Sequence, residues 1–280
     1  MNILFIHQGY PGQFDKLVNK LSERGDRIAV ISLEKARKRL KNQEVFVGYT
    51  IGRGNGSDTH HLSIEAESKF IRGEYVAIEA EKMKKKGYKP DLIVGHPGWG
   101  EMLFLDCIWP TTPQIHYVEF CYSAQNNDSA FDDIYNSKGG SWYDSARVSS
   151  KNASVLMSLN RMTWGLTPTW FQYNTMPSWA KLKTSVIHDG IDTKWAAPDV
   201  DDQFVINNTL TLTKQDKVVS FVNRTFEPYR GIHIFIEAIV EVLRECPDVK
   251  IVLVGRDTPK VSYGKHRQDG KGWLETLLFN

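Results

Sequence analysis

Cysteine is scarce in this chain of 280 residues, and its three occurrences lie far apart. They are Cys107, Cys121 and Cys246. None has the CxxC spacing of a zinc site, and three dispersed thiols do not make the disulfide framework of a small secreted domain. HExxH is also absent, and the pair His60-His61 has only Asp58 close to it in sequence. The sequence therefore predicts no metal site and no cofactor, and it fits a reducing compartment.

Long apolar runs are lacking as well. No stretch approaches the roughly 20 apolar residues that cross a bilayer, and the apolar start at Asn2–His7 has no cationic lead of a signal peptide. The net charge is +2, and the basic patches at residues 35–41 and 84–86 lack the interleaved aromatic residues that stack on bases. We therefore expect a cytoplasmic protein that binds no nucleic acid, while contact of the first patch with the inner face of a membrane stays open.

Several motifs of nucleotide and nucleophile chemistry are missing. The sequence contains no Walker loop GxxxxGK, no GxGxxG and no GxSxG nucleophile elbow. These absences argue against kinase-like hydrolysis of nucleoside triphosphates, Rossmann-type dinucleotide binding and a serine nucleophile.

The chain does contain a strand, a glycine loop and a helix in direct succession at its start. The apolar run Asn2–His7 leads into Gln8–Gly12, after which apolar residues recur at helical spacing up to Leu21. A second apolar strand follows at Arg27–Ser32, as in a βαβ unit whose parallel strands are buried on both faces. Later strands of the same sheet are expected at Asp91–Val94, Gln114–Val118, Trp164–Thr167 and Thr184–Ile187.

The same pattern restarts after a polar, proline-containing stretch that ends near Asp202. It comprises a strand at Val218–Val222, an amphipathic helix from Ile232, a strand at Lys250–Val254 and a last helix at Trp273–Phe279. We therefore predict an α/β protein with two Rossmann-like domains, residues 1–198 and 199–280. We expect the second to be incomplete, because it holds about two strands where an open sheet has about four to six. A sheet of this kind leaves a strand edge and an apolar helix face exposed.

The strongest candidate for chemistry is the segment Asn223–Gly231 (NRTFEPYRG), between a buried strand and an amphipathic helix. The amides at a helix N-terminus attract phosphate, and Arg224 and Arg230 add two permanent charges with a fork that matches phosphate oxygens. The alternative is a pair of surface arginines, one of them paired with Glu227. The residues alone leave both interpretations open.

Other candidates follow the strands of the first domain. Gly9 and Gly12 let a ligand approach the backbone closely, although glycines also serve as plain strand-to-helix connectors. His96 follows a strand and has Glu101 nearby, and Glu119 follows the next strand. A histidine at a strand end can act as an acid, a base or a hydrogen-bond donor, but a lone histidine is more often structural, and Glu119 is also suited to capping a turn.

Three segments together resemble the family-four glycosyltransferases of the GT-B fold. They are NRTFEPYRG, HPGWGE at residues 96–101 and VIHDGID at residues 186–192. The resemblance extends over nearly the whole chain. It implies a GT-B type fold and an enzyme that transfers a sugar, with retention of configuration and without a metal, from a nucleoside-diphosphate sugar to a saccharide, glycoconjugate or lipid-linked acceptor, as in polysaccharide biosynthesis.

The resemblance also implies roles for particular residues. Arg224, Arg230 and Gly231 would bind the donor diphosphate, and the glycines of the first loop would border the diphosphate and the acceptor cleft. His96 would lie near the transferred sugar as a catalytic or positioning residue. The paired glutamates that hold the donor in this family would lie beyond residue 280, which leaves a non-catalytic nucleotide- or phosphosugar-binding fragment as the alternative function.

Overall fold

The computed structural model describes residues 1–40, 44–124, 141–199, 201–207, 209–261 and 267–279. The chain divides into two compact units. Unit 1 comprises Met1–Phe131 and Gly139–Gly190, and unit 2 comprises Asp132–Lys138 and Ile191–Asn280. The predicted boundary between residues 198 and 199 stays a prediction.

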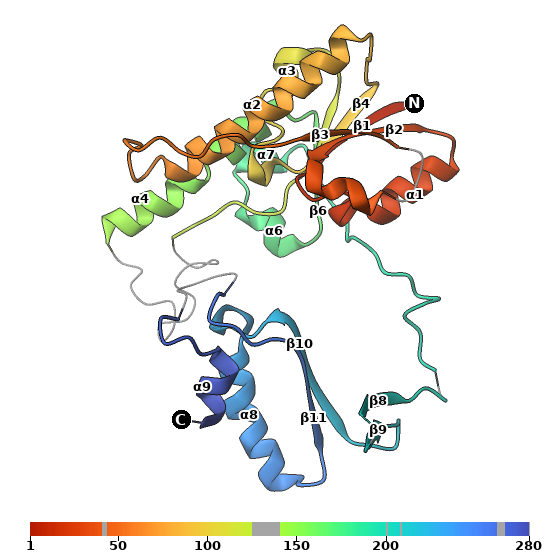
Figure 1. Ribbon diagram of the computed structural model, residues 1–280, viewed down its shortest axis with the longest axis vertical. Helices are drawn as coiled ribbons and strands as arrows, with labels where there is room; N and C mark the ends of the chain where they lie inside the picture. Colours follow the sequence, from red (N-terminus) through yellow and green to blue (C-terminus); the bar gives the residue numbers. More distant parts are fainter. Residues whose placement is uncertain (41–43, 125–140, 200, 208, 262–266, 280) are drawn as a thin grey trace. The chain divides into compact units, whose positions relative to one another are not determined.

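Unit 1 is built on a seven-stranded sheet with the order β3-β2-β1-β4-β5-β6-β7. All six pairings between its neighbouring strands are parallel, which confirms the predicted Rossmann-like sheet (Figure 1). The strand order reverses between β1 and β4, and this is the place where open α/β sheets bind ligands. The strands are β1 (Asn2–Ile6), β2 (Arg27–Leu33), β3 (Val45–Tyr49), β4 (Leu92–Gly95), β5 (Gln114–Tyr117), β6 (Trp164–Thr167) and β7 (Thr184–Val186).

Alternate residues of the central strands enter two different cores. In β1, Leu4 and Ile6 pack in a cluster with Val76 of helix α2. Ile3 and Phe5 pack in a second cluster with Val18 of helix α1. Side chains alternate between the faces of a strand, so the continuous apolar run reflects a strand that is covered on both faces.

The helices of unit 1 agree broadly with the helical periodicity of the sequence. The longest, α2, includes Gly73, where a Cβ would lie 2.8 Å from the carbonyl oxygen of Gly100. Most of the polar excursion predicted at Glu119–Ser145 lies outside the described residues. The helices are α1 (Asp15–Glu23), α2 (Ile64–Lys85), α3 (Leu105–Ile108), α4 (Trp142–Lys151), α5 (Ala153–Arg161), α6 (Trp170–Thr175) and α7 (Ser178–Lys181), and 3-10 turns occur at Gly12–Phe14, Glu34–Arg39 and Pro97–Trp99.

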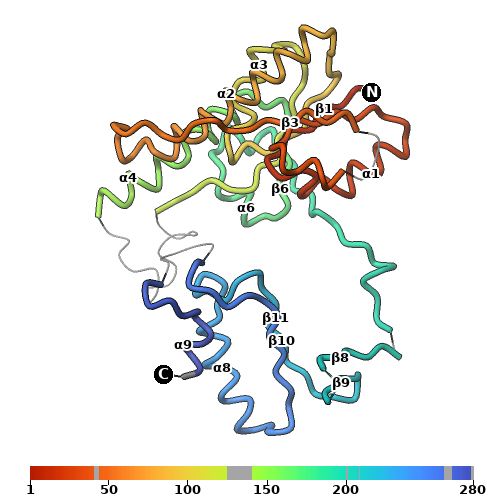
Figure 2. Tube along the Cα trace, in the orientation of Figure 1, coloured from red at the N-terminus to blue at the C-terminus, as the bar shows by residue number. Residues whose placement is uncertain are grey.

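Unit 2 contains the predicted second strand-loop-helix pattern, which Figure 2 traces from β10 through α8 and β11 to α9. Its two main strands pair in parallel. The sequence did not predict the antiparallel hairpin that precedes them. The elements are β8 (Phe204–Asn207), β9 (Leu210–Leu212), β10 (Val218–Thr225), a 3-10 turn at Pro228–Arg230, α8 (Ile232–Glu245), β11 (Lys250–Arg256) and α9 (Trp273–Phe279).

One face of the two-stranded sheet of unit 2 packs against helix α8. Phe221 and Leu253 pack against the buried residues Ile232 and Ile236 of α8. On the opposite face Val222 is 66% exposed. Throughout the described residues of both units, no helix has the length and apolar character that a membrane span requires.

Candidate functional site

The candidate site of unit 1 lies where three neighbouring strands end. His7 follows β1, His96 follows β4, and Glu119 lies two residues beyond β5. Because β4 pairs in parallel with both β1 and β5, these residues share one edge of the sheet. The structure therefore brings together His96 and Glu119, which the sequence had singled out, and adds His7.

His7 is a buried, neutral histidine whose hydrogen bonds define its tautomer. Its Nδ1 accepts a bond of 3.0 Å from the amide of Gly9, so Nε2 carries the proton and donates to Oε1 of Gln13 at 2.9 Å. Burial, and secondly the nearby His96, lower the pKa of His7 to about 4. His7 was not predicted as a site residue from the sequence, although its position directly after an apolar strand matches that of His96.

The glycine loop after β1 packs against this ring. A Cβ on Gly12 would lie 2.4 Å from Cε1 of His7, and its φ is +53°. Both features favour glycine at this position. Gly9 is less constrained, since a Cβ there would lie 3.4 Å from the Arg39 side chain.

Both nitrogens of the His96 ring are hydrogen-bonded. Nδ1 accepts from the amide of Gly98 at 3.0 Å, and the protonated Nε2 donates to Oε2 of Glu119 at 2.9 Å. The ring stacks on Trp99 with 3.9 Å between centroids, and only 3% of the residue is exposed. The hydrogen bond from His96 is the main cause that lowers the pKa of Glu119. Glu119 therefore carries its charge at neutral pH, and its side chain is 46% exposed.

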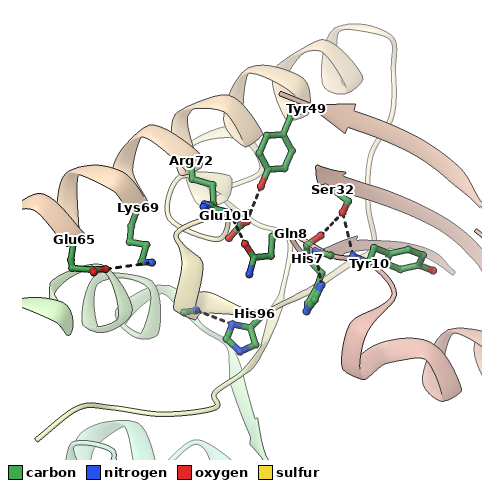
Figure 3. A network of polar contacts seen from close by, with 12 residues as sticks. His7, Gln8, Tyr10, Ser32, Tyr49, Glu65, Lys69, Arg72, His96 and Glu101 are labelled. Atoms are coloured by element: carbon green, nitrogen blue, oxygen red, sulfur yellow. Dashed lines mark hydrogen bonds and ion pairs between the residues drawn. The ribbon is translucent and has the colours of Figure 1, made fainter. Parts of the chain in front are cut away.

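Glu101 belongs to a separate buried network, which Figure 3 shows between α2, β3 and the glycine loop. Its Oε1 accepts from the Tyr49 hydroxyl at 2.7 Å and lies 3.5 Å from Nη1 of Arg72. The same Nη1 donates to Oε1 of Gln8 at 2.6 Å. Glu101 is 1% exposed, so its carboxyl group supports the loop from inside the unit and does not reach its surface.

The Glu101 carboxyl group should make stability depend on pH. Burial raises the pKa of Glu101 above the ordinary glutamate value of 4.5, with Arg72 opposing this shift. Above that pH the folded chain binds more protons at this site than the unfolded chain, so the free energy of unfolding falls as pH rises. We expect the wild type to lose stability relative to Glu101→Gln as the pH rises above the ordinary glutamate value of 4.5. Urea unfolding of both at several pH values measures this difference, and a difference that does not change with pH would contradict it.

In unit 2 the arginine segment runs from the end of β10 to the start of α8. Arg224 is exposed near the end of the strand. Nε of Arg230 lies 3.5 Å from Oε1 of the fully buried Glu227. Gly231 caps α8 with a φ of +79°, and a Cβ there would have no heavy atom within 4 Å. Of the residues predicted to bind a diphosphate, Arg230 and Gly231 thus lie at the start of α8 and Arg224 lies near the end of β10. The predicted ion pair of one arginine with Glu227 is also present.

The part of the chain that the structure describes contains no cluster of metal ligands. Among those residues there is no group of three or more histidine, cysteine, aspartate or glutamate side chains that could hold a metal ion.

Comparison with known structures supports the fold. The chain is similar to a candidate UDP-N-acetylglucosamine 2-epimerase from Listeria monocytogenes, with a TM-score of 0.52 and 12% sequence identity over 94% of this chain and 63% of that one. It is similar to MnaA of S. aureus in a co-structure with UDP, with a TM-score of 0.50 and 14% identity over 92% of this chain and 62% of that one. It is also similar to the catalytic domain of starch synthase IV from Arabidopsis thaliana bound to ADP and acarbose, with a TM-score of 0.50 and 14% identity over 91% of this chain and 68% of that one. The chain thus spans less than two thirds of the length of the first two. These matches confirm the predicted GT-B type of fold.

Comparison of sequences gives the family. No curated protein sequence matches the chain. The profile of the glycosyl transferase family 4 group matches residues 24–196, which is more than half of the chain and includes His96, Glu101 and Glu119. This chain therefore belongs to the glycosyl transferase family 4 group.

Proposed function

We propose that this chain acts in a retaining, metal-independent transfer of a sugar from a nucleoside-diphosphate sugar to a saccharide or glycoconjugate acceptor. The observation that carries the proposal is the position of Arg230 and Gly231 at the start of α8, with the exposed Arg224 near the end of the preceding strand β10. Membership of the family supports it from unit 1, which contains most of the matched residues.

The chemistry of the reaction explains why two arginines are suited to this place. Breaking the bond between the sugar and the phosphate leaves negative charge on the diphosphate, and preorganised cations stabilise that charge most in the transition state. Arg230 is preoriented by its ion pair with Glu227, and the first amides of α8 supply the positive end of a helix dipole. Together these groups can stabilise the leaving diphosphate in the role that a divalent cation has in other transferases.

Calorimetric titration of UDP, GDP and ADP into the purified chain tests the donor site. We expect one nucleotide to bind, and Arg224→Ala to weaken it about 10- to 100-fold, because a hydrogen bond to a charged group contributes about 1.5–3 kcal/mol. Arg230→Gln should weaken it similarly and keeps a polar partner for Glu227. Arg244→Ala is the matched control, since Arg244 is exposed at the far end of the same helix and pairs with Glu241.

The outcomes separate the alternatives. If no nucleotide binds, or if both variants bind as the wild type does, the proposed donor site is wrong. Nucleotide-sugar binding without turnover would favour a non-catalytic binding protein. Release of an epimerised sugar would favour an epimerase, a function named for one of the structures with a similar fold.

A further inference from the structure

We propose that the carboxylate of Glu119 binds a hydroxyl group of the acceptor sugar and that His96 is a positioning residue for Glu119. This inference rests on the proposed function. It assigns the substrate contact to Glu119, and it gives His96 an indirect part in the reaction.

His96 uses both of its ring nitrogens in hydrogen bonds within the protein. Nδ1 is occupied by the Gly98 amide and Nε2 by Glu119, so neither ring nitrogen is left to contact a substrate. The His96 ring is also packed closely against the residues of the turn that follows it. It stacks on Trp99, and a Cβ on Gly98 would approach it to 2.6 Å. A histidine held in this way serves to orient its carboxylate partner.

The carboxylate of Glu119 carries the next step. His96 occupies Oε2, and no other described residue hydrogen-bonds to this side chain, which is 46% exposed. Oε1 is therefore available to accept a hydrogen bond from a substrate hydroxyl. The lowered pKa of Glu119 makes the group a weak base, which suits hydrogen bonding and orientation better than removal of a proton.

The surroundings indicate a saccharide as the ligand. Phe120, the next residue, stacks on Phe171 with 6.0 Å between ring centroids, and Phe171 is 62% exposed. Phe171 belongs to α6, which follows β6, the neighbour of β5. Sugars present hydroxyl groups at their edges and apolar C–H groups on their faces. A carboxylate followed in sequence by a half-buried phenylalanine that stacks on the exposed Phe171 matches both.

Saturation-transfer NMR on the full chain tests the proposal, with methyl glycosides of glucose, mannose and N-acetylglucosamine as probes. At least one glycoside should bind, and Glu119→Gln should weaken it about tenfold or more, as expected for loss of a charge-assisted hydrogen bond. Glu65→Gln is the control, because it removes an exposed carboxylate on α2 that pairs with Lys69. Equal binding by the wild type and Glu119→Gln overturns the proposal, and so does the absence of binding by any glycoside.

The pH dependence of glycoside binding tests the role of His96. The wild type should keep binding to a lower pH than His96→Leu, because loss of the His96 hydrogen bond lets the pKa of Glu119 rise toward its ordinary value. His96→Gln, which retains a donor, should restore much of the wild-type profile. Groups facing Glu119 are His96, His7, whose pKa is about 4, and Tyr117, whose pKa is raised by burial. The residual pH dependence of Glu119→Gln reports the contribution of His7.

Glycoside binding and nucleotide binding together distinguish a failure at Glu119 from a failure at the proposed donor site. Loss of glycoside binding in Glu119→Gln with unchanged nucleotide binding supports the inference. Nucleotide binding that is unchanged in Arg224→Ala would contradict the proposed donor site and would not affect the conclusion from glycoside binding. Identical pH profiles for the wild type and His96→Leu, with both chains folded by circular dichroism, would show that His96 does not position Glu119.

Discussion

Arg72→Ala should lower the free energy of unfolding of unit 1 by about 3–5 kcal/mol at pH 7, the range seen when one partner of a buried ion pair is removed. Arg72 is the cation closest to the buried Glu101 carboxylate, at 3.5 Å, and its side chain is 20% exposed. Without it the carboxyl group either stays charged in an apolar site or takes up a proton, and both cost free energy. The variant also loses the 2.6 Å bond to Gln8 in the glycine loop.

Protonation of Glu101 should make the loss of stability in Arg72→Ala depend on pH. Because the pKa of Glu101 is already raised by burial, acid neutralises the carboxyl group that Arg72 leaves behind. The loss of stability should therefore shrink between pH 7 and pH 5. Urea unfolding at the two pH values measures this change.

Two further variants isolate the buried charge. Adding Glu101→Gln to Arg72→Ala should recover part of the stability, because the double variant contains no unpaired carboxylate. Lys82→Ala is the surface control, since Lys82 is 59% exposed in its ion pair with Glu79 and such pairs contribute about 0.2–1 kcal/mol. A loss in Arg72→Ala no larger than that in Lys82→Ala would show that Arg72 does not stabilise Glu101.

The strands that position the site were predictable because they are buried on both faces. The apolar runs around Phe5 and Ile93 appear in the sequence without interruption, and they end at His7 and His96. The same reasoning found α8 and the arginines before it. A histidine at a strand end was a recognisable signal, and applying it to β1 as well as β4 would have selected His7.

The pairing of side chains was not predictable, because the partners are distant in sequence. Arg72 is 64 residues from Gln8, and Tyr49 is 52 residues from Glu101. Nothing in the local pattern indicates that Glu101 is turned into the unit while Glu119 is exposed. These orientations depend on how α2 and β3 pack on the sheet.

The hairpin β8–β9 was missed for a different reason. All four residues of β8 are exposed, so burial imposes no alternation of apolar and polar residues on them. The local signal was the asparagine pair at residues 207 and 208, of which Asn207 accepts hydrogen bonds from the amides of Thr209 and Leu210. Asparagine is a typical turn residue for this reason.

Gly100→Ala should have a comparably large effect on unit 1, because two independent costs coincide at this residue. Its φ is +99°, a conformation that side chains rarely adopt, and a Cβ would lie 2.2 Å from the carbonyl oxygen of Lys69 in α2. Backbone strain of this kind costs about 1–3 kcal/mol and forced overpacking costs a similar amount. The backbone of α2 cannot rotate away as the end of a flexible side chain could, and Gly73 makes the reciprocal close approach to Gly100.

Gly87→Ala separates the two costs. Gly87 has a φ of +85°, and a Cβ there would have no heavy atom within 4 Å. It should therefore show the conformational cost of about 1–2 kcal/mol alone. The excess loss in Gly100→Ala, measured by urea unfolding, reports the contact with α2. Equal losses in the two variants would mean that α2 moves aside without cost.

The displacement in Gly100→Ala should also reach the candidate site. Gly100 ends the 3-10 turn Pro97–Trp99, whose last two residues hold His96 through the Gly98 amide and the Trp99 ring. If α2 and this turn are forced apart, His96 can no longer hold Glu119 in place, and glycoside binding should weaken in Gly100→Ala and not in Gly87→Ala. Nucleotide binding at Arg224 in unit 2 should remain in both, because that segment packs within its own unit. A Gly100→Ala chain that is destabilised yet binds glycosides as the wild type does would show that Glu119 is oriented independently of this turn.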